Sequence, residues 1–196
     1  MFANRYTALV DACSLVGVLG RNILLSLAEA EFFRLRWSTE ILNETEAALV
    51  ELFKRRGHDD SAGAANTSRI AMETAFPEAS VTEYEAFLIQ GEGLPDPKDA
   101  HVLAAAIATQ AQTIITENLK DFPASELGRY GIEARSIDAF IADTISLQEG
   151  RAIPALRAMR SRLRRPELTP AELLRKMEAA KLIATADLVR PYIGSL

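Results

Sequence analysis

The sequence has little cysteine, little histidine and no long apolar run. Its single cysteine, Cys13, excludes an internal disulfide framework and is typical of a reducing compartment, so we expect a cytoplasmic protein. One cysteine and two histidines, His58 and His101, are too few for a usual structural zinc site. No apolar run is long enough to cross a bilayer, and Asp11 interrupts the N-terminal apolar stretch before it resembles a secretion signal. A metal would therefore be held by carboxylates, which favours Mg²⁺ or Mn²⁺.

Charge is distributed unevenly along the chain. The 196 residues carry a net charge of −5 and are enough for one domain, or for one domain with a small appendage. Residues 151–196 hold ten Lys or Arg against four Asp or Glu, a net charge of +6, which leaves −11 for residues 1–150. An acidic body is thus followed by a basic tail.

Short apolar runs, rich in β-branched residues, alternate with stretches of helical periodicity. The expected strands are residues 6–10, 35–38, 79–82, 113–116 and 132–136. The expected helices are residues 18–31, 39–54, 69–76, 97–107 and 138–147, with a loop at 55–68. This alternation predicts an α/β fold with a parallel sheet covered on both faces.

Four acidic residues and one asparagine lie where the expected strands end and where the central helix begins. Asp11 follows the first strand, Asn118 and Asp121 follow the fourth, and Asp96 and Asp99 open the central helix. Helix capping alone would explain the last two. Ligands of open parallel sheets bind beyond the carboxyl ends of the strands, so these side chains are expected to converge. Gathered carboxylates bind divalent cations, which position phosphate oxygens and lower the pKa of a bound water.

The helix expected at 39–54 adds two further acids. Glu44 and Glu46 both flank its apolar stripe, and periodicity does not choose between them. His101 lies two residues after Asp99 and points to another side of the helix, which favours a structural hydrogen bond over direct catalysis. Thr116 could hydrogen-bond a ligand or could simply be a strand residue.

Four segments together resemble the signatures of PIN domains. They are residues 8–11, 38–44, 94–107 and 114–123, and the last two, Asp-Pro-Lys-Asp-Ala-His-Val-Leu-Ala-Ala-Ala and Thr-Glu-Asn-Leu-Lys-Asp-Phe-Pro, are the most specific. PIN domains are metal-dependent ribonucleases, and many are VapC-type toxins. The resemblance covers about residues 5 to 145 and implies a three-layer α/β/α sandwich with a central parallel sheet.

The resemblance also implies roles for individual residues. The catalytic residues would be Asp11, Glu44 and Asp99, and this chooses Glu44 over Glu46 by analogy only. The ligands of Mg²⁺ or Mn²⁺ would be Asp11, Asp99, Asp96, Asn118 and Asp121. The family often has an aspartate where this chain has Asn118, and an amide is a neutral, weaker ligand.

The C-terminal part lies outside this resemblance. We expect a PIN-like nuclease domain at residues 1–147 and a basic, all-helical extension at 148–196, with a break at Gly150 and a helix that Pro166 ends. Thr169 and Glu172 form a capping box that starts another helix. The arginines that we expect to contact RNA are Arg157, Arg160, Arg164 and Arg165; contact with a partner protein, or with solvent alone, is the alternative.

The resemblance implies that the protein is a metal-dependent endoribonuclease, the toxin of a type II toxin–antitoxin system. Its partners would be an RNA substrate, a cognate antitoxin and a second copy in a homodimer, with no membrane partner. The alternative is a catalytically inactive PIN-like module that binds RNA or protein, which Asn118 favours. A dehalogenase-like phosphatase is set aside because Cys13 stands where that class needs its second aspartate.

Overall fold

The computed structural model describes residues 6–164 and 167–196, apart from the side chains of Gln90 and Glu92. Five parallel strands form one sheet in the order β3-β2-β1-β4-β5. They are β1 (Thr7–Val10), β2 (Arg34–Ser38), β3 (Ser80–Val81), β4 (Thr113–Ile115) and β5 (Glu133–Arg135). Every residue of β1 and β4 is buried, as expected for parallel strands covered on both faces.

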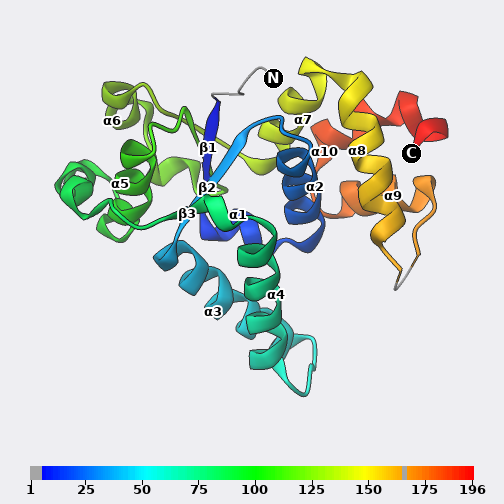
Figure 1. Ribbon diagram of the computed structural model, residues 1–196, viewed down its shortest axis with the longest axis horizontal. Coiled ribbons are helices and arrows are strands. Elements are labelled where there is room, and N and C mark those ends of the chain that lie inside the picture. Colours follow the sequence, from blue (N-terminus) through cyan, green and yellow to red (C-terminus); the bar gives the residue numbers. More distant parts are fainter. Residues whose placement is uncertain (1–5, 165–166) are drawn as a thin grey trace.

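Helices cover both faces of the sheet, which confirms the predicted α/β/α sandwich (Figure 1). The α-helices of the body are α1 (Ala12–Val16), α2 (Val18–Glu29), α3 (Thr39–Arg55), α4 (Ser61–Ala75), α5 (Ala100–Ala108), α6 (Ala124–Leu127) and α7 (Ile137–Leu147). In Figure 1, α5 and α6 lie on one side of the sheet, and α2 and α7 lie on the other.

Short 3₁₀ helices connect several of these elements. They are η1 (Pro77–Ala79), η2 (Glu85–Gly93), η3 (Pro97–Asp99), η4 (Leu119–Asp121) and η5 (Gly128–Tyr130). The central helix therefore begins as η3, with Asp96 as the predicted cap, and continues as α5.

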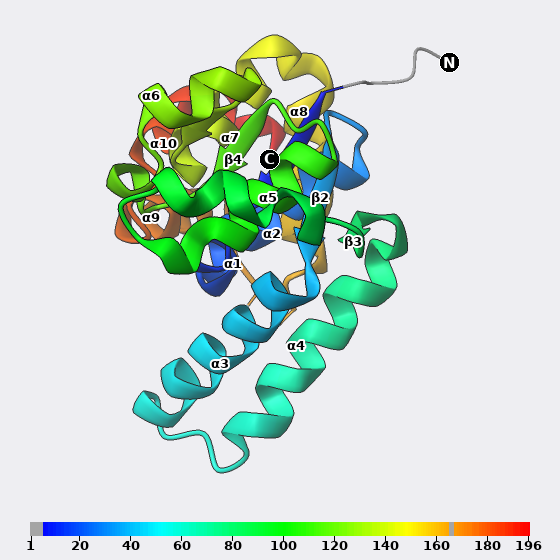
Figure 2. The same ribbon diagram turned by 90° about the vertical axis from the view of Figure 1, so that its left-hand side faces the viewer.

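Helices α3 and α4 form an arm that projects away from the sheet (Figure 2). The loop predicted at residues 55–68 is wrong from residue 61 onward, because α4 begins there. Asp60 caps α4 by accepting the backbone N–H of Gly63, and Ala65 and Met72 are buried. Small residues that resemble a loop in the sequence thus allow close packing of α4 on α3.

The tail is helical, as predicted, and packs on the body. Its elements are α8 (Glu149–Arg162), α9 (Pro170–Ala179), α10 (Ile183–Val189) and η6 (Arg190–Ser195). Gly150 does not break the chain but lies in the first turn of α8, and Pro166 lies outside the described residues. The predicted capping box of Thr169 and Glu172 is confirmed.

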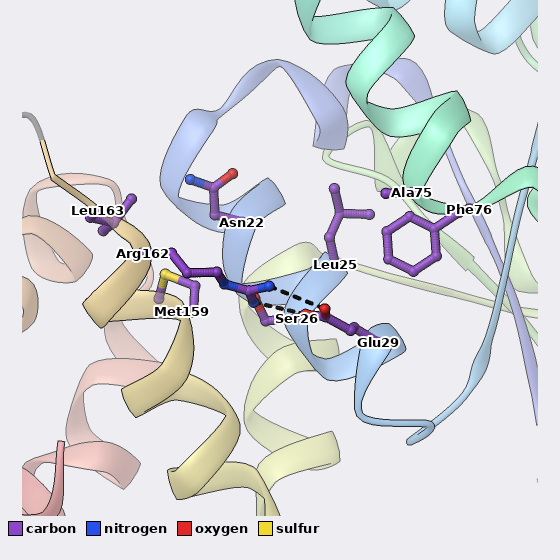
Figure 3. Close-up of a pocket in the computed structure, with 9 residues that line it drawn as sticks. All are labelled: Asn22, Leu25, Ser26, Glu29, Ala75, Phe76, Met159, Arg162 and Leu163. Atoms are coloured by element: carbon purple, nitrogen blue, oxygen red, sulfur yellow. Dashed lines mark hydrogen bonds and ion pairs between the residues drawn. The ribbon is translucent and has the colours of Figure 1, made fainter.

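One hydrophobic core includes residues of the body and of the tail. Helix α8 packs on α2, and α10 packs on α7. Arg162 of α8 reaches Glu29 and Ser26 of α2 across a pocket of about 280 Å³ (Figure 3). The boundary at residues 147/148 stays a prediction. Within the described residues, no helix combines the length and apolar character needed to cross a bilayer.

Candidate active site

Asp11 lies at the centre of the sheet's carboxyl edge, directly after β1. It is 5% exposed and caps α1, with Oδ1 accepting the N–H of Ala12 at 2.7 Å. Its Oδ2 accepts the hydroxyl of Thr116 at 2.7 Å and the thiol of Cys13 at 3.1 Å. Thr116 follows β4, the neighbour of β1, and is fully buried. These bonds hold the Asp11 carboxylate in one orientation.

Three further carboxylates interact with Asp99 or lie beside it. Burial raises the pKa of Asp99 to about 6, and the nearby charges of Asp11, Asp96 and Asp121 add to this, while His101 opposes it. Asp96 accepts the N–H of Lys98 at 3.0 Å and so fixes the entry to η3. Residues that are far apart in the sequence therefore repel one another at one place in the fold.

A close backbone contact sets the position of the helix that carries Asp99. A Cβ atom on Gly91 of η2 would lie 2.5 Å from the Cα atom of Ala100, the first residue of α5. Only glycine fits there, so η2 can press against the start of α5. The position of Asp99 thus depends on a residue that the sequence alone did not mark.

Glu44 reaches this region through a histidine. Its Oε1 lies 3.2 Å from Nε2 of His101, whose Nδ1 is buried with no partner among the described residues. One turn earlier on α3, Glu40 accepts the hydroxyl of Tyr84, which lowers the pKa of Glu40; the nearby charge of His101 lowers it further. Burial and this bond raise the pKa of Tyr84 to about 12.

The remaining polar residues at this edge have separate environments. Burial and the charge of Asp11 raise the pKa of the Cys13 thiol to about 11, so the thiol is neutral and unsuited to nucleophilic attack. Asn118 donates its backbone N–H to Thr116 at 3.0 Å, and the residue is exposed. Ser38 caps α3 by accepting the N–H of Ile41 at 3.2 Å.

The donor set has the chemistry that a hard divalent cation requires, because carboxylates predominate and repel one another. The side chains are not arranged as a formed metal site. In the described part of the chain, no group of three or more His, Cys, Asp or Glu side chains is placed so that it could hold a metal ion. Asp11 uses both oxygens in hydrogen bonds, and Glu44 is paired with His101.

Two family models match the chain. The first, described as PIN domain, covers residues 7–120, which is more than half of the chain. The chain belongs to the PIN domain family. The second, described as VapC50 C-terminal domain, covers residues 137–191 and so includes α7 as well as most of the tail.

A curated relative of this PIN domain protein comes from Mycobacterium tuberculosis (strain ATCC 25618 / H37Rv) and is named "Putative ribonuclease VapC50". It is 40% identical over 77 residues, which are 39% of this chain and 46% of that protein. The match thus spans about half the length of the relative. No solved structure gives a significant match.

The tail arginines expected to contact RNA have different environments in this PIN domain protein. Arg160 donates from Nη1 to the carbonyl of Leu168 and holds the tail together. Arg157 and Arg164 are exposed, and Arg165 lies outside the described residues.

Several contacts at this site had weak sequence signals or none. The bond between Thr116 and Asp11 and the pairing of His101 with Glu44 agree with roles considered from the sequence. The contact of Tyr84 with Glu40 has no sequence signal, because 44 residues separate the two and Tyr84 lies outside the four motif segments.

Proposed function

We propose that this PIN domain protein is an endoribonuclease that depends on Mg²⁺ or Mn²⁺. The observation that carries the proposal is that Asp99, at the end of η3, feels the charges of Asp96 beside it, of Asp11 after β1 and of Asp121 beyond β4. A cation relieves such repulsion, and the acidic site then accepts a phosphate group. The name of the VapC50 relative supports the choice of RNA as substrate.

Each residue of the chain has its own part in this proposal. Asp11 and Asp99 would bind the cation directly, with Asp96, Asn118 and Asp121 as further ligands. When bound, the cation supplies a water of lowered pKa and neutralises charge on the phosphate. Thr116 orients Asp11 through its hydroxyl. His101 holds Glu44 on the α3 side of the site, where Glu44 would help Asp11 and Asp99 to hold the cation.

The test compares carboxylate variants in cleavage of a labelled single-stranded RNA. Asp11→Asn and Asp99→Asn should each lower the rate with Mg²⁺ or Mn²⁺ by more than about tenfold, since losing even an outer-sphere partner of a metal costs about that much. Asp59→Asn, an exposed residue between α3 and α4, is the matched control and should cleave like the parent. EDTA should abolish cleavage.

Undiminished cleavage by either site variant would contradict the assignment. Calorimetry then distinguishes the ribonuclease from the alternative, a catalytically inactive module. If the parent binds neither Mg²⁺ nor Mn²⁺ and does not cut RNA, the protein is a binding module. Reversible thermal unfolding with and without the metal provides a second measure of binding.

We also propose that the protein is the toxin of a type II toxin–antitoxin pair and forms a homodimer. The VapC50 name and the match to its C-terminal domain support this assignment. Expression should arrest growth, and co-expression of the product of the adjacent gene should restore it. Light scattering of the purified protein should give twice the chain mass of 21.5 kDa.

A further inference from the structure

A groove of about 870 Å³ runs between the body and the tail. We call it the tail groove. Its walls come from the segment that joins α1 to α2, the C-terminal end of α3, the start of α7, and helix α9 with the residues after it. One end includes Cys13, whose thiol contacts both Asp11 and Thr116. This end of the tail groove therefore lies beside Asp11, although none of the candidate site's carboxylates lines it.

The charged residues of the tail groove leave a positive surplus. Arg56, Lys176 and Lys181 line it, and none of them takes part in an ion pair among the described residues. The two acids that line it are already engaged. Glu117 accepts the N–H of Ile137 at the start of α7, and Asp138 accepts two N–H groups at the start of α10. An anionic occupant would find three cations that form no ion pair within the described part of the chain.

Ser14 provides a second, independent observation at the active-site end. The residue is 3% exposed and lines the tail groove, yet its hydroxyl has no hydrogen-bond partner among the described residues. Leaving a buried hydroxyl unpaired is unfavourable. An occupant with oxygen acceptors, such as a phosphate, would satisfy it.

The floor of the groove is apolar. It includes Val16, Val18 and Leu19 beside the α1–α2 junction, and Val18 is 41% exposed. A single RNA strand presents two kinds of surface: the apolar faces of its unpaired bases and its acidic phosphates. The apolar residues of the groove are complementary to the bases, and its basic residues and unpaired hydroxyl are complementary to the phosphates.

We propose that the tail groove binds the single-stranded RNA that flanks the cleaved bond, with its phosphates on Arg56, Lys176, Lys181 and the Ser14 hydroxyl. This rests on the proposed ribonuclease function. RNA is favoured over an acidic protein because the Cys13 end of the groove lies beside Asp11, where the strand to be cleaved would be held. Lys176 and Lys181 of the tail thereby add phosphate contacts to those of Arg56 and Ser14 in the acidic body.

The test uses charge reversals with neighbouring residues as controls. Arg56→Glu and Lys176→Glu change residues that line the groove; Arg55→Glu and Arg175→Glu make the same charge change one residue away, on exposed positions outside it. All four are made in an Asp11→Asn background and measured in EDTA, so that the labelled RNA stays intact. Binding of a labelled RNA of about 16 nucleotides, the upper end of usual single-strand site sizes, is followed by anisotropy over a range of salt concentrations.

The groove variants should weaken binding by at least about tenfold more than their neighbours, and each should reduce the salt slope by about 0.7 for a lost phosphate contact. Equal effects of groove and neighbour variants would overturn the proposal. So would unchanged RNA binding with lost binding to the co-expressed product of the adjacent gene, since the groove would then be a protein surface. Circular dichroism confirms that each variant is folded.

A second measurement separates this proposal from the ribonuclease assignment. In the Asp11 parent, the groove variants should cut a dinucleotide, which occupies only the carboxylate site, at the parental rate, but should cut the longer strand with a raised KM. A parent that cuts neither substrate contradicts the ribonuclease function, whereas anisotropy still decides whether the groove binds RNA.

Discussion

At the scale of single residues, the surroundings of Asp99 disfavour the ionised form of its carboxyl group. Its carboxyl group is partly buried, and three other acids add to the burial in favouring the neutral form. Its pKa is about 6 in the folded chain against an ordinary value of 3.8. The folded state therefore holds more protons than the unfolded state between these two values, so stability falls as pH rises through this window.

Asp99→Asn should stabilise the metal-free protein at neutral pH, because it removes the charge that the fold disfavours. Solvent screening reduces the gain, and we expect a rise in Tm of about 2–4 °C, which corresponds to about 1 kcal/mol in a chain of this size. Below pH 3.8 the difference should vanish, since the native carboxyl is then protonated in both states. Thermal unfolding in EDTA at both pH values measures it. A Tm rise of the same size in acid would show that repulsion is not the cause.

His101 joins Glu44 of α3 to the helix that carries Asp99, and we expect it to act as a positioning residue. His101→Ala should weaken Mn²⁺ binding by about tenfold, the usual effect of losing a partner that orients a metal ligand. His101→Gln, which can still donate to Glu44, should recover part of the affinity. Calorimetry of Mn²⁺ binding to these variants, in the parental and Glu44→Gln backgrounds, gives the coupling free energy between His101 and Glu44. An equally large loss in the Glu44→Gln background would show that His101 acts independently of Glu44.

At the scale of elements, helix starts are the points at which distant segments are joined. Asp138 lies in the first turn of α7, and its two oxygens accept the N–H groups of Ala184 and Thr185, each at 2.9 Å. A carboxylate of the body thus caps α10 of the tail. Glu117 caps α7 in the same way by accepting the N–H of Ile137.

Asp138→Ala should lower the free energy of unfolding by about 1 kcal/mol, the usual loss when a capping side chain is removed. Asp138→Asn keeps an acceptor and should lose less. Asp187→Ala on α10 is a suitable control, because its ion pair with Arg190 is exposed and worth little. Urea titrations of the three variants measure the differences. A loss for Asp187→Ala as large as that for Asp138→Ala would contradict the capping role.

At the scale of the whole molecule, body and tail depend on one another. Leu156 of α8 and Trp37 of β2 are both fully buried and belong to the same hydrophobic core. Trp37 is the only tryptophan in the chain, so its fluorescence reports on the body alone. The two parts should therefore unfold together.

Leu156→Ala should destabilise the whole chain by about 2–5 kcal/mol, the cost of a core cavity. The urea midpoint followed by Trp37 fluorescence should fall, and it should coincide with the midpoint from circular dichroism. Ala155→Gly, a neighbouring change that removes one methyl group, should cost only about 1 kcal/mol. A Trp37 midpoint that stays at the parental value in Leu156→Ala would show that the tail unfolds independently.

Local order could be predicted well from the sequence. Buried strands, the caps at Ser38, Asp96 and Thr169, and acids at strand ends are encoded within a few residues, where hydrogen bonds and apolar periodicity act. The same local reasoning failed at α4, whose small residues resemble a loop and form a helix because α3 is available to pack against.

The sequence by itself determined the α/β alternation and the acids that follow the strands, since a parallel sheet brings every strand's carboxyl end to one edge. Only the tertiary structure decided that His101 pairs with Glu44, that Gly91 sets the start of α5, and that the tail encloses a groove beside Asp11. These contacts depend on how whole helices seat against each other. Apolar packing is not directional, so local sequence does not fix the relative positions of the helices, which are set only when the complete core has formed.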